Sequence, residues 1–118
     1  MAVKTKTMPD GVGLIEVTGS LLAGPEIGEL RNAVKECIER QATRLLIDFA
    51  DATYMNSSAM GVLVSALTSY TKRRWELKIC CLNNSINAIF VITKLNRVFA
   101  ISKTREEAIE MFGRGLQH

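Results

Sequence analysis

The chain has 118 residues, 47% of them hydrophobic and 23% charged, which suits one folded domain spanning residues 1–118 and argues against disorder. Its net charge of +3 is small, and Lys and Arg are scattered among few aromatic residues, which argues against direct nucleic-acid binding. No apolar run reaches the ~18 residues of a membrane-spanning helix, and the N-terminus lacks the apolar stretch of a signal peptide, so we expect a cytoplasmic protein without membrane insertion.

The first half of the chain predicts a hairpin, a helix and a buried strand. Two strands flank the turn sequence "PDG", because proline presets one backbone dihedral there and glycine accepts the left-handed one. Pro25 suits the first turn of a helix, and apolar residues follow it at helical spacing. The expected elements are strands over 3–8 and 12–19, a loop over 20–24, a helix over 25–41 and a strand over 44–50.

The second half alternates helices and strands. After a loop over 51–56 we expect a helix over 57–73, a strand over 76–82, a helix over 86–96, a strand over 97–102 and a last helix over 104–112. "NNS" at 83–85 offers helix caps, and Thr104 and Glu107 have capping-box spacing. The order β-β-α-β-α-β-α-β-α places helices between strands, which implies parallel pairing with right-handed crossovers. The sequence therefore predicts an α/β fold with a mixed sheet of four to five strands and about four helices.

Asn56, Ser57 and Ser58 follow the loop "ADATYM" and stand at the start of the apolar helix expected over 57–73. One such residue is explained as an N-cap, which satisfies a first-turn amide. An N-cap does not explain three consecutive polar residues. Gly61, inside the same helix, costs about 1 kcal/mol relative to alanine, which indicates close approach of a neighbouring strand or of a partner.

Other chemistry-bearing residues are few. Cys37, Cys80 and Cys81 have no metal-ligand spacing, and we interpret them as small buried residues. His118, the only histidine, is the last residue, where chain ends fray. We therefore expect no metal site, no Ser-His-Asp triad and no catalytic residue, and the absence of a GxxxxGK loop leaves no expected cofactor.

The stretch "MNSSAMGVLVSAL", between the strand ending "LLIDFADATY" and a helix, resembles the core motif of STAS domains, the bacterial anti-sigma factor antagonists and their relatives. The family pattern is Asp-Ser-Ser/Thr-Gly-hydrophobic-Gly followed by an apolar helix. "IEVTGSL" resembles the family's second strand and Thr-Gly turn, and "SINAIFVITKLNRVFAI" and "TREEAIEMF" resemble its late helix, final strand and closing helix. The resemblance covers about residues 3 to 112.

The resemblance implies a partner-switching role. An anti-sigma factor with serine kinase activity would phosphorylate Ser57, with Ser58 as the secondary candidate, and a phosphatase would reverse the modification. The unphosphorylated protein would bind the anti-sigma factor, as a monomer or weak dimer. The residues carried over to the partner-binding surface are Asn56, Ser57, Ser58, Ala59, Met60, Ser20, Leu21 and Leu22.

The sequence departs from the family pattern at four positions. Asn56 stands where an aspartate is usual, and Ala59 replaces a glycine. Leu22 lies near a position where many antagonists carry an aspartate beside the phosphoserine. Lys94 stands where a glycine commonly ends the late helix, a role that we assign to Asn96, because asparagine tolerates left-handed geometry.

Two alternative functions remain open. Some STAS domains are scaffolds or accessory subunits of larger signalling assemblies or of lipid transport systems, and there the serine is only a cap or a docking contact. A small enzyme with Ser57 or Ser58 as nucleophile would need a base and an oxyanion site, and the sequence offers no histidine for that purpose before its last residue.

Overall fold

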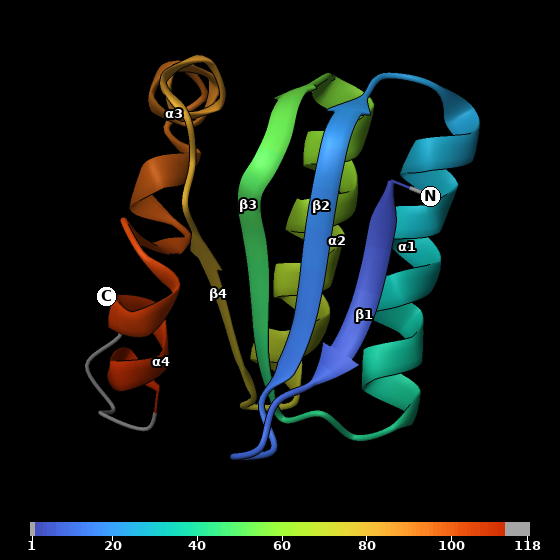
Figure 1. Ribbon diagram of the computed structural model, residues 1–118, viewed down its shortest axis with the longest axis vertical. Coiled ribbons are helices and arrows are strands. Elements are labelled where there is room, and N and C mark those ends of the chain that lie inside the picture. The colour runs from blue at the N-terminus through green and yellow to red at the C-terminus, as the bar shows by residue number, and fades with distance from the viewer. Residues whose placement is uncertain (1, 113–118) are drawn as a thin grey trace.

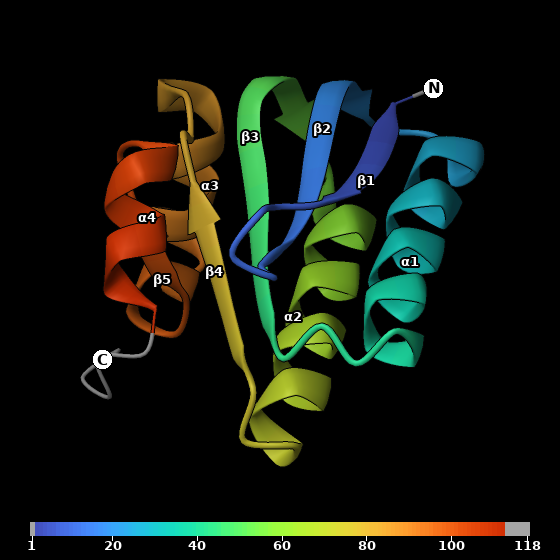
Figure 2. The same cartoon turned by 60° about the horizontal axis from the view of Figure 1, so that its bottom comes forward.

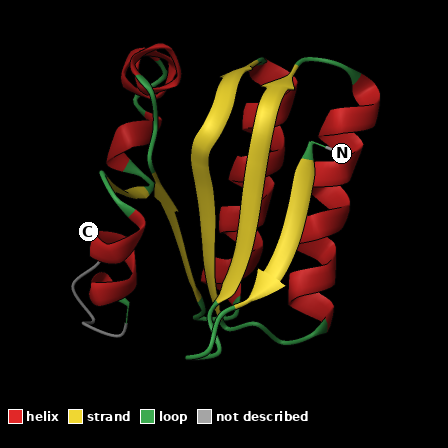
Figure 3. Cartoon of the chain, viewed as in Figure 1, coloured by secondary structure: helices red, strands yellow, loops and turns green. Residues whose placement is uncertain are grey.

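Five strands form one mixed sheet in the computed structural model, which describes residues 2–112 of the chain. The strands are β1 (Val3–Thr7), β2 (Gly13–Leu21), β3 (Arg44–Met55), β4 (Glu76–Cys80) and β5 (Ala100–Ser102). They lie in the order β1-β2-β3-β4-β5, with β1 antiparallel to β2 and the other pairs parallel. The helices are α1 (Gly24–Glu39), α2 (Ser57–Lys72), α3 (Asn84–Ile92) and α4 (Arg105–Met111), with a 3-10 turn η1 (Leu95–Arg97), as Figures 1 and 3 show. The predicted fold class and element order are confirmed.

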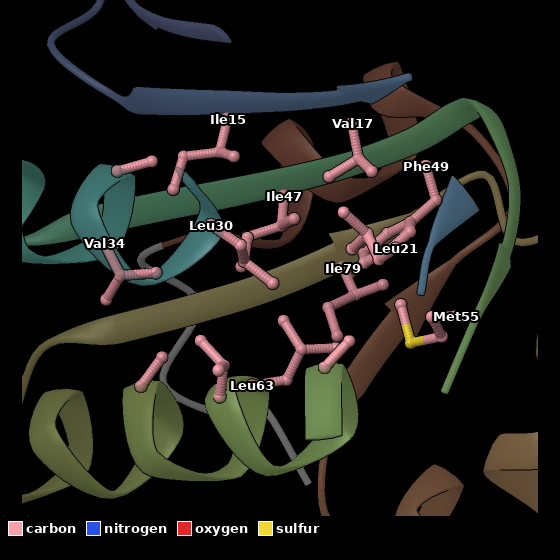
Figure 4. Close-up of a cluster of buried hydrophobic side chains, with 14 of the residues drawn as sticks. Ile15, Val17, Leu21, Leu30, Val34, Ile47, Phe49, Met55, Leu63 and Ile79 are labelled. Carbon is pink, nitrogen blue, oxygen red and sulfur yellow. The ribbon is translucent and has the colours of Figure 1, made fainter. Parts of the chain in front are cut away.

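The two faces of the sheet are covered by different helices. Side chains of β2, β3 and β4, among them Ile15, Ile47 and Ile79, pack against Leu30 of α1 and Leu63 of α2 (Figure 4). The alternate side chains of the same strands point to the opposite face, where α4 packs in a smaller cluster formed by Val12, Leu14, Leu46, Cys80, Ala108 and Phe112. Because both faces of the middle strands are buried, their sequences are almost continuously apolar. None of the helices in residues 2–112 combines the length and apolarity needed to cross a membrane.

The strands β2 and β3 are longer than the sequence predicts. Ser20 and Leu21 were expected in a loop, as was the segment 51–55, but Leu21 pairs with Met55 at the ends of the two strands. Gly19 lies at a register shift and adopts a φ of 76°, so that the strand continues through a bulge instead of turning. Leu21 and Met55 are both fully buried, and their burial stabilises the extension.

The segment after α3 is also different. The helix ends at Ile92, and Lys94, not Asn96, adopts the left-handed conformation, with φ 64° and ψ 14°. The strand expected over 97–102 is reduced to Ala100–Ser102, because Leu95–Arg97 forms the turn η1.

Arg105 ties α4 to the sheet. Its Nε and Nη2 donate to Asp48 Oδ2 at 2.9 and 2.7 Å, and its Nη2 also donates to Glu16 Oε2 at 2.8 Å. Asp48 is only 4% exposed. Together with Lys6, whose Nζ lies 3.1 Å from Glu16 Oε1, Arg105 lowers the pKa of the Glu16 carboxyl, and the two carboxylates raise the pKa of Arg105. The last helix is therefore held by charge as well as by its apolar face.

We expect Arg105→Ala to lower the free energy of unfolding by about 1–3 kcal/mol, because nearly buried Asp48 loses its charged donor. Urea unfolding checks this, with the exposed Arg97→Ala as control.

The ion pair also predicts a dependence of stability on pH. Because the pKa of Glu16 lies below its ordinary 4.5, the contribution of Glu16 to stability is present above pH 4.5 and is lost as pH falls through the folded value. Arg105→Ala should therefore lose less stability than the wild type between pH 5 and pH 3. Equal acid sensitivity of the two proteins would contradict this account of the ion pair.

Candidate functional site

Asn56 fixes the start of α2 against the end of β2. Its Oδ1 accepts a hydrogen bond from the Ala59 amide at 3.0 Å, and its Nδ2 donates to the Leu22 carbonyl at 3.0 Å. The Asn56 amide donates to the Leu21 carbonyl at 3.2 Å. One side chain therefore caps the helix and holds the segment before α1, which places the N-terminus of α2 beside Leu21 and Leu22.

Ser57 and Ser58 occupy the first two positions of α2, and both are exposed. Within residues 2–112 neither hydroxyl forms a hydrogen bond. The amides of a first helical turn have no partner inside the helix, and the Asn56 side chain takes only that of Ala59. The two hydroxyls thus lie at the positive end of the helix dipole and are open to a second protein.

The surface around the two serines comes from the ends of β2 and β3. Ser20 and Thr53 are exposed and share a hydrogen bond of 2.8 Å between their hydroxyls. Leu22 is 52% exposed. Tyr54, which the sequence analysis missed, is 43% exposed and pairs with Ser20 in the β2–β3 ladder. No alternation in "ATYM" signals this exposure, because Thr53 and Tyr54 are both exposed between buried Ala52 and Met55.

Three residues assigned to the partner-binding surface lie in the core instead. Leu21 and Ala59 are fully buried and Met60 is 5% exposed, so none of them offers a surface contact. Leu21 is on the face of β2 that the helices cover, and Ala59 and Met60 are on the inner face of α2. Their part in the site is to hold its exposed residues in place.

Gly61 is exposed and lies in α2 without a packing reason. A Cβ atom built at Gly61 would meet nothing within 4 Å. The close approach that the sequence analysis inferred is therefore not made by a neighbouring strand, and only the surface interpretation of this glycine remains.

One cluster in the described part of the chain gathers side chains of the kinds that bind metals. The ligand atoms of Asp48, Cys80 and Cys81 lie within 4.8 Å of one another. Asp48 Oδ2 is occupied by Arg105, and its Oδ1 accepts from the Ala50 amide at 2.8 Å. Burial raises the pKa of both thiols, which keeps them protonated, and all three cysteines are free. The hydrogen bonds of Asp48 and the protonated thiols indicate a structural role for this cluster. His118 lies outside the described residues.

Sequence comparison matches this chain to STAS domains and to anti-sigma factor antagonists. The sequence model of the STAS domain matches residues 4–108. An anti-sigma-B factor antagonist of Listeria monocytogenes is 32% identical over 78 residues, which cover 63% of this chain and 68% of that protein.

Solved structures agree in fold. A protein of Thermotoga maritima superposes with a TM-score of 0.84 at 20% identity, over 92% of each chain. The Bacillus cell fate determinant SpoIIAA, solved in its phosphorylated form, superposes with a TM-score of 0.72 at 18% identity, over 92% of this chain and 97% of that one.

The two bonds of the Asn56 side chain yield a prediction for stability. Asn56→Ala loses the cap and the tie to Leu22, and we expect a loss of about 1–2 kcal/mol in urea unfolding. Asn56→Asp keeps the cap and gains from the dipole but cannot donate to the carbonyl, so its stability should change by less than about 1 kcal/mol. Asn84→Ala is the control, because Asn84 is exposed at the start of α3. Asn56→Ala unfolding at the same urea concentration as Asn84→Ala would contradict the assigned role.

Proposed function

The chain belongs to the STAS domain family, and from this premise we propose that it is an anti-sigma factor antagonist whose binding is switched by phosphorylation of Ser57. In this proposal the unphosphorylated chain binds an anti-sigma factor that has serine kinase activity, and a phosphatase restores the binding-competent form. The observation that carries the proposal is the position of Ser57, exposed at the start of α2 with a hydroxyl that forms no hydrogen bond within residues 2–112.

Phosphorylation of Ser57 is compatible with the fold. A phosphate adds about −1.5 to −2 charge, and a helix N-terminus favours negative charge through its free amides and its dipole. The Asn56 cap uses its own oxygen and the Ala59 amide, so a group on Ser57 displaces no existing bond. The effect of the phosphate would therefore fall on a docked partner, which has to desolvate it.

Asn56 takes over part of what a carboxylate does in the family pattern, and it adds a donor. Its Nδ2 donates to the Leu22 carbonyl, a bond that an aspartate could not make. The exposed Leu22 then offers an apolar contact beside Ser57 in place of a second negative charge. We propose that the kinase recognises this site by shape and by apolar contact with the side chains of Leu22 and Tyr54.

The proposal assigns no catalysis to the chain, because the kinase supplies the base and the nucleotide site. It also places the protein in the cytoplasm as a monomer or weak dimer. The second candidate function is a scaffold or accessory subunit that is not phosphorylated. The uncharged Asn56 and the apolar Leu22 favour that alternative, since Asn56 replaces an aspartate of the family pattern and Leu22 lies near a second aspartate position.

Phosphate transfer should be confined to Ser57. We expect the anti-sigma factor kinase of the same organism, supplied with ATP, to add one phosphate to the wild type and to Ser58→Ala and none to Ser57→Ala, as read by mass spectrometry of tryptic peptides. Ser58→Ala is the matched control, because both hydroxyls are exposed one residue apart. Transfer to Ser58 in the wild type would move the site, and no transfer to either would favour the scaffold function.

Binding should follow the charge at Ser57. Ser57→Ala should bind the anti-sigma factor as the wild type does, with no more than about 1 kcal/mol lost in stability, because Asn56 supplies the cap. Ser57→Asp should keep its thermal stability, because the dipole favours the charge by about 0.3–1 kcal/mol, and bind at least tenfold more weakly. Calorimetric titration and thermal melts measure the two effects. Equal affinity of the wild type, both variants and the phosphorylated protein would leave Ser57 as a helix residue without a switching role.

A further inference from the structure

A groove runs between α1 and α2, which lie side by side behind the sheet in Figures 1 and 2. Its volume is about 820 Å³. The floor is apolar, with Val34 and Ile38 from α1 and Val62 and Ala66 from α2. Ser58 lines one end, so the groove begins beside the proposed phosphorylation site and follows α2 away from it.

The wall contributed by α2 consists of small residues. Ser58, Gly61, Ser65 and Ser69 recur every three or four positions and all line the groove. A Cβ at Gly61 would meet open space, so the chain's own packing does not require the glycine, although it costs helix stability. Small side chains along one helix allow another backbone to approach closely, which gives the groove the shape of a seat for a third helix.

The rim of the groove is basic. Arg31 and Lys35 of α1 and Arg73 at the end of α2 line it, against one acidic residue, Glu39. Arg31 and Lys35 are exposed, and in residues 2–112 neither forms an ion pair. Two cations one helical turn apart beside an apolar floor are complementary to a helix with acidic residues on the edge of its apolar face.

We propose that the groove between α1 and α2 docks an acidic amphipathic helix of the anti-sigma factor, an inference that rests on the proposed function. The apolar face of that helix packs on Val34, Ile38, Val62 and Ala66, and its acidic residues pair with Arg31 and Lys35. Charge complementarity and continuity with the Ser57 site are the grounds for this occupant. A phosphate on Ser57 then acts at the mouth of the groove, where it offsets the basic rim and repels the acidic helix.

Binding of the unphosphorylated full chain to the anti-sigma factor kinase of the same organism, measured by calorimetry, tests the docking site. Lys35→Glu reverses a rim charge, and Ser65→Trp fills the groove two turns from Ser57. Each should weaken binding about tenfold or more and leave thermal stability unchanged, because both side chains are exposed. The matched controls are Lys103→Glu, an exposed lysine near α4, and Thr71→Trp, an exposed residue of α2 that does not line this groove, and both should bind within about twofold of the wild type.

The occupant is identified with a photocrosslinking amino acid in place of Ser65. The expected product joins it to an acidic helical segment of the anti-sigma factor, and a crosslink to a basic or extended segment would overturn the proposal. So would wild-type affinity of Lys35→Glu and Ser65→Trp when Ser57→Asp binds weakly, a result that leaves the proposed function standing. A wild-type dimer that Ser65→Trp dissociates would make a second copy of the chain the occupant. No binding of the wild type would overturn the proposed function and this docking site with it.

Discussion

The parallel pairing of β2 with β3 as far as Leu21 and Met55 is the constraint on which the site depends. Both terminal residues are fully buried, so the carboxyl ends of the two strands are anchored in the core. This pairing brings Ser20 beside Thr53 and places the Leu22 carbonyl within reach of Asn56. The start of α2 is thereby fixed to the ends of β2 and β3, and the serines that follow Asn56 are exposed there.

The residues that hold the start of α2 in place are different from the residues that a modification would change. Leu21, Ala59 and Met60 are buried and hold the backbone at the start of α2. Ser57 and Ser58 are exposed, and their side chains form no hydrogen bonds in the described chain. On the opposite face of the sheet, Arg105 binds Asp48 and Glu16 and holds α4 in place. A charge added at Ser57 therefore changes the surface that a partner meets, and the fold has no bond to lose.

The proposed phosphorylation site and the groove lie on one continuous surface of α2. The dipole at the start of the helix favours an anion on Ser57, and the basic rim formed by Arg31, Lys35 and Arg73 favours an acidic partner. The two preferences compete when both anions are present. In the proposed switch, this competition is the physical reason why one phosphate would change the affinity of a groove that extends well beyond it.

The sequence by itself determined the element order, the α/β fold and the position of Ser57 at a helix start, because these follow from local periodicity, caps and turn residues. It placed Leu21, Ala59 and Met60 on the partner surface, and only the tertiary structure showed them buried, since facing the core depends on which strands and helices meet. The bulge at Gly19 and the exposed Tyr54 were decided in the same way, by pairing between β2 and β3, which are distant in the chain. The groove belongs wholly to the tertiary structure, because Lys35 and Ser65 become neighbours of one cavity only when α1 and α2 pack on the same face of the sheet.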